Sequence, residues 1–179
     1  MKKKLLLHAC CAPCLMGTLP MIGGGFEISC FWYGANIHPY TEYRARLEAL
    51  ADYAGKNSIN LIVRDYYGLA EFVRNTINDL KNRCAYCYRL RLEETAKQAK
   101  EGGFDAFSTT LLVSPYQNRE KIMEIGEQCS ESHGINFFCG DFRANFWQGQ
   151  KTARESGVYM QKYCGCIFSE EERFLSKSY

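Results

Sequence analysis

The most constraining feature of this sequence is a short apolar run that leads directly into three cysteines. Residues 5–7 are all leucine and follow three lysines, and residues 8–14 then read His-Ala-Cys-Cys-Ala-Pro-Cys. Three consecutive leucines are typical of a strand buried on both faces, and Pro13 suits the first turn of a helix, where its missing N–H costs nothing. The thiols are therefore expected beyond the carboxyl end of a strand and near a helix N-terminus, which favours the thiolate that binds metals.

Length and charge set the outer limits on function. With 179 residues the chain fits one domain that buries a core without disulfides. A net charge of +2 excludes a strong overall basic field for nucleic acid and leaves only local patches. No apolar run approaches the roughly 18 residues of a membrane span, and the basic start leads into too few apolar residues for a signal peptide. We expect a cytoplasmic protein with no membrane partner.

The ten cysteines are many for a chain of this kind. In a reducing cytosol, cysteines at short spacings indicate metal or redox chemistry and not a disulfide framework. Seven fall in three groups, which are Cys10, Cys11 and Cys14, then Cys84 and Cys87, then Cys164 and Cys166. The remaining three, Cys30, Cys129 and Cys139, stand apart and are expected to be ordinary buried thiols.

Strand and helix patterns alternate along the chain, as in βαβ units. Strands are predicted at residues 5–7, 27–33, 59–65, 106–110 and 136–139. Helices are predicted at residues 15–22, 41–56, 69–80, 84–101 and 118–132. The last forty residues are predicted to be helical apart from one break at 164–166. The predicted fold class is α/β, a single domain over residues 1–179 with a mainly parallel five-stranded sheet flanked by helices. A helical C-terminal segment, about residues 141–179, is expected to complete the site.

Unusual segments follow each predicted strand. They are residues 10–14, 34–40, 65–67, 111–117 and 141–143. In an open parallel sheet, ligands bind beyond the carboxyl ends of the strands, near the point where the strand order reverses. The sequence therefore predicts one composite site, where cysteines distant in sequence come within reach of each other.

The cysteine spacings favour a cluster over a zinc ribbon. Tetrahedral zinc commonly uses two CxxC pairs, whereas this chain offers CC, CxxC and CxC spacings. A 4Fe-4S cluster also takes four thiolates and tolerates irregular spacing. A cluster that takes four of the seven grouped cysteines leaves three others. These three either bind a second metal or are structural or redox-active. A thioredoxin-like pair at Cys84 and Cys87 and a buried turn at residues 164–166 are the alternatives.

Six segments, in order, closely resemble the motif series of the QueH family of epoxyqueuosine reductases. They are residues 8–14 (HACCAPC), 36–39 (NIHP) with Glu42-Tyr43, 83–91 (RCAYCYRLR), 109–117 (TTLLVSPYQ), 141–143 (DFR) and 163–166 (YCGC). The likeness spans residues 8 to about 169. One departure is Gly34-Ala35 before Asn36, where an Asn-Pro pair is expected; it removes no metal ligand.

The resemblance implies an enzyme that reduces the epoxide of epoxyqueuosine at the wobble position of tRNA to give queuosine, independently of cobalamin. It implies a 4Fe-4S cluster with an adjacent mononuclear iron, or zinc in its place. The implied fold is Rossmann-like, similar to nucleotide-binding HUP domains. The implied partners are a tRNA anticodon stem-loop carrying epoxyqueuosine and an external low-potential electron donor such as ferredoxin or flavodoxin.

Our hypothesis divides the seven cysteines between two metal groups. Cys10, Cys11, Cys84 and Cys87 are assigned to the cluster, because each pair lies in a loop at a helix start where thiolates are favoured. The second metal would take Cys14, Cys164 and Cys166. Asp141 is a further candidate, either as an oxygen ligand or as a proton donor, and the residues expected at the reacting centre are Cys14 and Asp141.

Aromatic and basic residues are candidate contacts to RNA, with core packing and a solvated surface as the alternatives. The aromatic candidates are Tyr86, Tyr88, Tyr116 and Phe142, and the basic candidates are Arg44, Arg46, Arg89, Arg91, Arg143, Lys151, Arg154 and Lys162. His8 is expected as a satisfied strand histidine or as support for the cluster. His38 either orients substrate or caps a turn.

Two other functions stay open at this point. An iron-sulfur desulfidase acting on thiolated nucleosides would show the same early cysteines, and a zinc-stabilised RNA-binding module is the non-catalytic alternative. The loop at residues 10–14, which follows the first predicted strand, also corresponds in position to the pyrophosphate-binding loop of nucleotide-binding α/β enzymes. Because thiols replace the glycine and serine that would hold phosphate, no ATP is expected.

Overall fold

Five parallel strands form the centre of the structure, a computed structural model in which residues 2–175 are described. The strands are β1 (Lys3–His8), β2 (Phe26–Tyr33), β3 (Asn60–Arg64), β4 (Ala106–Thr109) and β5 (Asn136–Phe137). Their order in the sheet is β3-β2-β1-β4-β5, and every neighbouring pair is parallel. The predicted α/β class with a five-stranded parallel sheet is confirmed.

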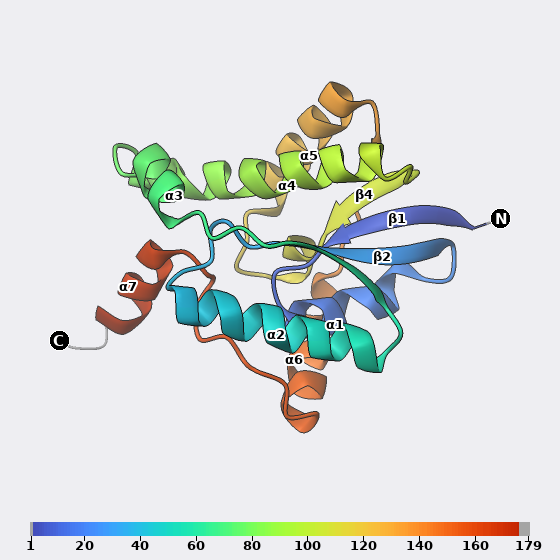
Figure 1. Cartoon of the computed structure of the whole chain (residues 1–179), viewed down its shortest axis with the longest axis horizontal. Helices are drawn as coiled ribbons and strands as arrows, with labels where there is room; N and C mark the ends of the chain where they lie inside the picture. The colour runs from blue at the N-terminus through green and yellow to red at the C-terminus, as the bar shows by residue number, and fades with distance from the viewer. Residues whose placement is uncertain (1, 176–179) are drawn as a thin grey trace.

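Helices cover both faces of this sheet. They are α1 (Ala12–Ile22), α2 (Tyr40–Lys56), α3 (Leu69–Thr76), α4 (Arg83–Glu101), α5 (Arg119–His133), α6 (Phe146–Glu155) and α7 (Ile167–Leu175), with short 3-10 segments at η1 (Leu80–Asn82), η2 (Thr110–Val113) and η3 (Arg143–Asn145). Figure 1 shows α4 and α5 on one side of the sheet and α1, α2 and α6 on the other. The molecule therefore has three layers, as expected for βαβ units.

The leucine run forms the middle of the core. Leu5, Leu6 and Leu7 are fully buried, because β1 is the central strand and both of its faces are covered by helices. Leu7 lies in register with Cys30 of β2 and with Ser108 of β4. A central parallel strand has no solvent-facing side, which explains why its sequence is apolar without alternation.

The strand order places the reversal point of the sheet beside β1. From β1 the chain proceeds outward to β2 and β3, and it then returns to the other side of β1 with β4 and β5. The loop after β1 and the segment after β4 consequently flank the same crevice at the carboxyl ends of the strands. The cysteines at residues 10–14 lie in the first of these loops.

Several predicted boundaries were wrong, among them the start of α1, which is Ala12 and not residue 15. Helix α3 ends at Thr76, and β5 is only two residues long. The last forty residues contain α6 and α7, but the whole stretch between them, 156–166, is not helical. Tertiary hydrogen bonds hold this stretch instead, among them one from the Tyr163 hydroxyl to the carbonyl of His38 at 2.6 Å. Residues 176–179 lie outside the described part of the chain.

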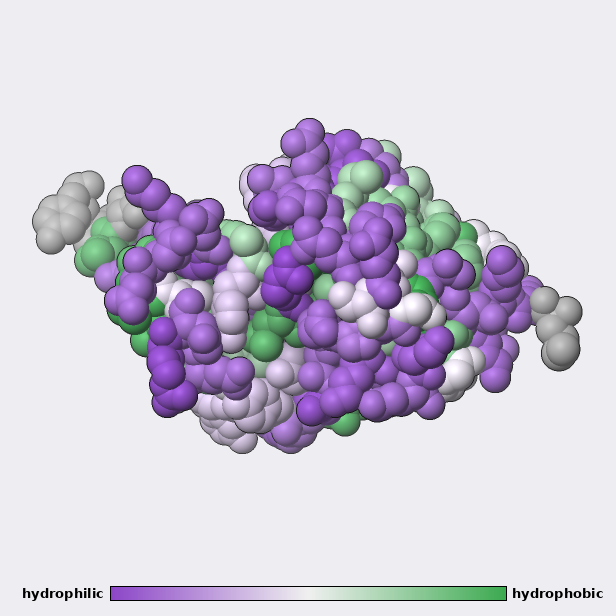
Figure 2. Space-filling view, turned by 90° about the horizontal axis from the view of Figure 1, so that it is seen from above, coloured by the Kyte–Doolittle hydropathy of each residue, from purple (hydrophilic) through white to green (hydrophobic). Residues whose placement is uncertain are grey.

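The surface is consistent with the modest net charge. Figure 2 shows a face that is largely hydrophilic, with apolar side chains in smaller areas between polar ones. Among residues 2–175, no helix has the length and apolar character needed to cross a bilayer.

Candidate metal centre

Two adjoining cavities at the carboxyl edge of the sheet bring the three cysteine groups together. The larger has a volume of about 520 Å³ and its lining includes Cys10, Cys11, Cys14 and Cys164. The smaller has a volume of about 200 Å³ and its lining includes Cys84, Cys87, Cys164 and Cys166. Cys164 lines both cavities. All seven thiols are free, so each is available as a ligand.

The first three thiols are held by the junction of β1 and α1. Cys11 is the extended residue before α1, and Cys14 lies in its first turn together with Pro13. All three cysteines of this loop are buried. Hydrogen bonds from Cys11 and Cys14 hold the pKa of the Cys10 thiol well below its usual range, whereas the hydrogen bond with Cys10 raises the pKa of Cys11 to about 12. Hydrogen bonds among the three sulfurs of this loop therefore favour a thiolate at Cys10.

Two buried arginines flank these sulfurs. Arg46 of α2 and Arg91 of α4 are each only 1% exposed. Burial alone would lower the pKa of Arg91, but the neighbouring sulfurs of Cys87 and Cys10 raise it. The Nε atom of Arg91 also donates to the Oδ1 atom of Asn36 at 2.6 Å. Fixed positive charge in the interior favours anionic sulfur at this place.

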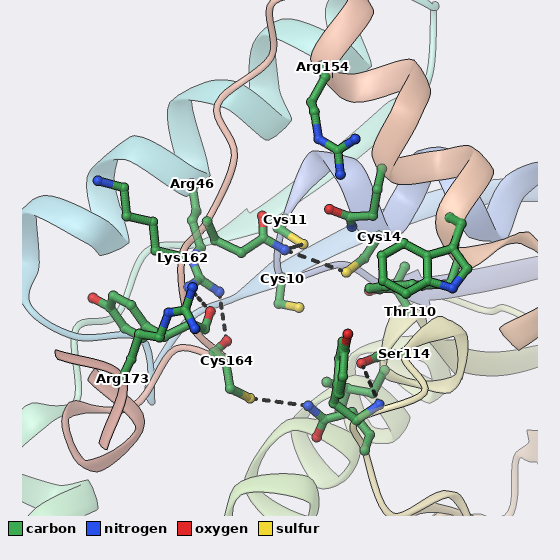
Figure 3. A pocket seen from close by; sticks show the side chains of 18 residues that line it. Cys10, Cys11, Cys14, Arg46, Thr110, Ser114, Arg154, Lys162, Cys164 and Arg173 are labelled. Atoms are coloured by element: carbon green, nitrogen blue, oxygen red, sulfur yellow. Dashed lines mark hydrogen bonds between the residues drawn. The ribbon is translucent and has the colours of Figure 1, made fainter. Parts of the chain in front are cut away.

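Each cysteine group receives an amide N–H on one sulfur. Asn36 donates to the Sγ atom of Cys87. The Nε2 atom of Gln161 donates to the Sγ atom of Cys11 at 3.0 Å, and the Nε2 atom of Gln117 donates to the Sγ atom of Cys164 at 3.2 Å (Figure 3). Hydrogen bonds to the sulfurs are one means by which proteins set the potential of an iron-sulfur cluster. Neither Gln161 nor Gln117 was predicted to have a role, because an isolated glutamine forms no recognisable sequence pattern.

The segment that carries Cys164 and Cys166 is fixed by contacts to its backbone. Arg46 donates to the carbonyls of Cys164 and Tyr163 at 2.8 and 2.9 Å, and the N–H of His38 donates to the carbonyl of Gly165 at 2.8 Å. Gly165 has a φ of +153°, and a Cβ atom there would lie 3.4 Å from Arg46. The tight segment therefore requires glycine between the two cysteines.

Two buried polar atoms at the larger cavity lack a protein partner. Within the described part of the chain, neither the Oγ1 atom of Thr110 nor the Oε1 atom of Gln161 has a hydrogen-bond partner. Both residues line the cavity, and Thr110 is labelled among its lining side chains in Figure 3. Such atoms are rare in protein interiors, and here they are available to a ligand. Thr110 lies in one of the segments quoted above, although no role was predicted for it.

Asp141 is not among the residues that line either cavity. Its two carboxylate oxygens accept from the Nε and Nη2 atoms of Arg143 at 2.8 and 2.6 Å, and both side chains are about half exposed. Hydrogen bonds from Arg143 hold the pKa of the Asp141 carboxyl well below its usual range. The structure thus places Asp141 as a surface carboxylate, apart from the thiols with which the sequence grouped it.

Several predicted RNA contacts have other roles. Arg46 and Arg91 belong to the interior, so neither is the solvated surface residue that was the alternative to a phosphate contact. Tyr88 and Phe142 are 2% exposed, and the Tyr88 hydroxyl donates to the side chain of Gln117 at 2.9 Å. Both rings are buried, and Tyr88 also lines the smaller cavity. Tyr116, in contrast, is 75% exposed and lines both cavities.

The donor set fits an iron-sulfur cluster. Seven free thiols, three amide N–H donors and two buried guanidinium groups supply soft ligands in a setting that stabilises negative charge. Across residues 2–175, no three His, Cys, Asp or Glu side chains already stand in a geometry that would hold a single metal ion.

A solved structure with the same fold is the U34-tRNA thiolase NcsA from Methanococcus maripaludis with its 4Fe-4S cluster. The TM-score is 0.61 at 12% sequence identity, and the match covers 96% of this chain and 64% of that one. At this level of identity the likeness shows the fold alone. This chain accordingly spans less than two thirds of the thiolase chain.

Sequence comparisons are more specific. The family model described as "Epoxyqueuosine reductase QueH" matches residues 5–172. The epoxyqueuosine reductase QueH of Dehalococcoides mccartyi is 35% identical over 97% of this chain and 96% of its own length, and that of Thermotoga maritima is 37% identical over 94% and 91%. On this evidence, and as its six motifs predicted, the chain belongs to the QueH family of epoxyqueuosine reductases.

Proposed function

We propose that this protein reduces the epoxide of epoxyqueuosine at the wobble position of a tRNA anticodon to the alkene of queuosine, without cobalamin. The observation that carries the proposal is the convergence of seven free cysteines on two adjoining cavities. Relatives named epoxyqueuosine reductase QueH, similar over almost the whole chain, support it. A cytoplasmic location and an external donor such as ferredoxin or flavodoxin belong to the same proposal.

The reaction consumes two electrons and two protons and releases the epoxide oxygen as water. When bound, a 4Fe-4S cluster supplies electrons one at a time, and an adjacent metal ion acts as a Lewis acid toward oxygen. The protein has to bind the nucleoside beside the thiols and deliver protons to the departing oxygen. The larger cavity, of about 520 Å³, lies against Cys10, Cys11 and Cys14 and falls in the usual size range for small-molecule sites.

For the cluster we keep Cys10, Cys11, Cys84 and Cys87 as ligands. Arg91 supports this set, because its guanidinium lies close to the sulfurs of both Cys10 and Cys87. The Asn36 side chain, which accepts from Arg91, also donates to Cys87. The buried guanidinium of Arg91 and the side-chain amide of Asn36 thus link the thiols of Cys10 and Cys87, which lie far apart in the sequence. This partition is a proposal that the absorption spectra of the variants below would test.

For the second metal, iron or zinc, we propose Cys14, Cys164 and Cys166. Cys164 lines both cavities, and its neighbour Cys166 lines the smaller one. Gln161 lies near Cys14 as well as Cys11, with its Nε2 atom 3.8 Å from the Cys14 sulfur. Asp141 is not carried forward as a ligand or proton donor, because Arg143 engages both of its oxygens.

Thr110 is our candidate for handling a proton. Its buried hydroxyl lines the larger cavity and has no partner in the described chain. We assign it to donate a hydrogen bond to the epoxide oxygen and to relay to it one of the two protons consumed. Thr110→Val keeps the side-chain shape and removes the hydroxyl. We expect it to lower kcat by roughly 10²-fold while leaving the metal content unchanged.

The first experiment measures iron, zinc and acid-labile sulfide per chain after anaerobic purification, together with turnover of epoxyqueuosine in tRNA. Four sulfides with more than four irons, or with four irons and one zinc, support the proposal when turnover is present. Zinc without sulfide, also after anaerobic reconstitution, would favour a zinc-stabilised RNA-binding module. Activity on thiolated tRNA in place of epoxyqueuosine tRNA would favour an iron-sulfur desulfidase.

Cysteine variants test the partition of ligands. Cys164→Ala should retain the absorption of the cluster and abolish turnover, and loss of the cluster in this variant would refute the assignment. Cys84→Ala should lose the cluster. The matched control is Cys139→Ala, which removes a half-buried thiol that lines neither cavity, and both absorption and turnover should remain.

A further inference from the structure

Exposed aromatic rings stand at the rim of the larger cavity. Trp147 is 63% exposed and Tyr116 is 75% exposed, although both line the cavity. Each contacts Phe146 edge-on, with ring centroids 5.8 Å apart for Tyr116 and 5.0 Å apart for Trp147. Phe146 itself is buried, so it anchors the two exposed rings to the protein. Large aromatic surface left in water beside a cavity is typical of a binding site.

Helix α6 presents Trp147 on a rigid support. The helix packs on α1 so closely that a Cβ atom on Gly149 would lie 2.6 Å from the Cα atom of Gly17. The side chain of Asn145 also donates to the carbonyl of Gly17 at 2.9 Å. A ring fixed in this way loses little conformational freedom when it binds a ligand.

The same cavity is lined by positive charge. Its lining residues include Arg46, Arg154, Lys162 and Arg173, and they include no aspartate or glutamate. The last three are exposed, and within residues 2–175 none of them forms an ion pair. Figure 3 shows these charged side chains around the cysteines. In a chain of net charge +2, Arg154, Lys162 and Arg173 thus form a local concentration of positive charge.

We propose that the rim of the larger cavity binds the unpaired bases of the anticodon loop, an inference that rests on the proposed function. Trp147 stacks on a base that flanks the reacting nucleoside, while Arg154, Lys162 and Arg173 contact the adjacent phosphates. Proteins recognise splayed-out RNA bases with aromatic faces, and cationic side chains beside them follow the backbone. An acidic protein surface would match the charge but would make no use of the two exposed rings.

The two tryptophans allow a direct test. Trp32 is fully buried, so only Trp147 can change its fluorescence by contact with a ligand at the rim. An unmodified anticodon stem-loop RNA is titrated into the full-length, reconstituted protein, and a fully paired RNA duplex of equal length serves as the control ligand. The stem-loop should quench the tryptophan emission and the duplex should not. Absence of quenching at saturating stem-loop would overturn the proposal.

Variants separate stacking from bulk and from charge. Trp147→Phe should bind the stem-loop within about threefold of wild type but without quenching, whereas Trp147→Leu should bind roughly tenfold or more weakly, because it keeps apolar bulk without a π face. Arg154→Gln should reduce the slope of log K against log salt by roughly 0.7. Lys97→Gln, an equal loss of charge at an exposed position on α4 outside both cavities, should change neither quantity.

Turnover of epoxyqueuosine tRNA by the wild-type enzyme, measured in parallel, keeps the two proposals distinguishable. Turnover without quenching of Trp147 would overturn only the role of the rim. Quenching without turnover would support the rim and remove the reductase function. Quenching by flavodoxin but not by the stem-loop would overturn the RNA assignment in favour of a protein partner.

Discussion

At the scale of single residues, Arg46 shows how a charge becomes part of the interior. Its Nε atom donates to the carboxylate of Glu42 at 2.7 Å, and its Nη atoms donate to the carbonyls of Tyr163 and Cys164. The Tyr159 hydroxyl also donates to Glu42. One buried guanidinium therefore joins α2 to the segment that carries Cys164. Because the Glu42 carboxylate is buried with it, removal of Arg46 leaves that charge without its partner.

Arg46→Met is expected to lower the free energy of unfolding by roughly 3–5 kcal/mol, because it leaves the Glu42 carboxylate buried without its partner. Urea denaturation of the metal-free protein measures this. Arg44→Met is the control on the same helix, since Arg44 pairs with Glu48 at the exposed surface, and its effect on the free energy of unfolding should be much smaller. Equal effects of the two substitutions would contradict the role of Arg46.

Two buried histidines make stability depend on pH. Burial lowers the pKa of His8 and of His38 from 6.5 to about 4. In the unfolded chain both bind protons near pH 6.5, whereas in the folded chain they do so only near pH 4. Above about pH 6.5 both histidines are neutral in the folded and in the unfolded chain, so they do not make the free energy of unfolding depend on pH. As the pH falls from 6.5 toward 4, only the unfolded chain takes up protons, and the free energy of unfolding decreases.

The expected loss in the free energy of unfolding between pH 7 and pH 5 is roughly 2–4 kcal/mol for the two histidines together. Urea denaturation of the metal-free protein at both pH values gives this difference. Unfolding at pH 5.5 should also take up about two protons per chain, as measured by potentiometric titration. Stability that does not change over this range would show that these histidines are already protonated in the fold.

At the scale of elements, the contact of α6 with α1 positions the rim of the larger cavity. Gly149→Ala would place a Cβ atom 2.6 Å from backbone atoms of Gly17 and 2.9 Å from the carbonyl of Pro13. Since backbone cannot move aside cheaply, we expect a loss of roughly 1–3 kcal/mol in the free energy of unfolding and weaker RNA binding through displaced Trp147. Thermal unfolding and the stem-loop titration measure the two effects.

Gly55→Ala is the matched control for this substitution. Gly55 lies inside α2, and a Cβ atom there would meet nothing within 4 Å. Alanine is the better helix former, so this variant should gain roughly 0.5–1 kcal/mol in stability and leave RNA binding unchanged. A loss of stability at both glycines would mean that steric contact between α1 and α6 is not the cause.

At the scale of the whole molecule, the seven grouped thiols lie on three segments that differ in their local structure. Residues 10–14 follow the central strand, residues 84–87 begin α4, and residues 164–166 end a stretch without helix. In the proposed partition, a bound cluster would link the first two segments, and the second metal would link residues 164–166 to the first through Cys14. Reconstitution should therefore slow amide hydrogen exchange in residues 156–166 more than in β1, which the core already protects. A uniform change, measured by mass spectrometry on both forms, would argue against metal ligands in the C-terminal stretch.

Much of the architecture could be predicted because it depends on local composition. The leucines at residues 5–7 indicate a strand buried on both faces, and Pro13 marks the start of the helix after it. The parallel sheet follows from the alternation of such strands with helices. Residues 156–163 were assigned to helix wrongly, because the conformation of this stretch depends on Arg46 and His38, which lie far away in the sequence.

The sequence by itself determined the fold class and the inventory of thiols, since strand and helix periodicity and cysteine spacing are local properties of the chain. The resemblance of its six motifs indicated the family. Only the tertiary structure decided which residues share the site. It buried Arg46 and Arg91 among the sulfurs, placed Asp141 at the surface with Arg143, and set Trp147 at the rim of the cavity. Burial and proximity depend on how distant segments pack, and no local pattern encodes them.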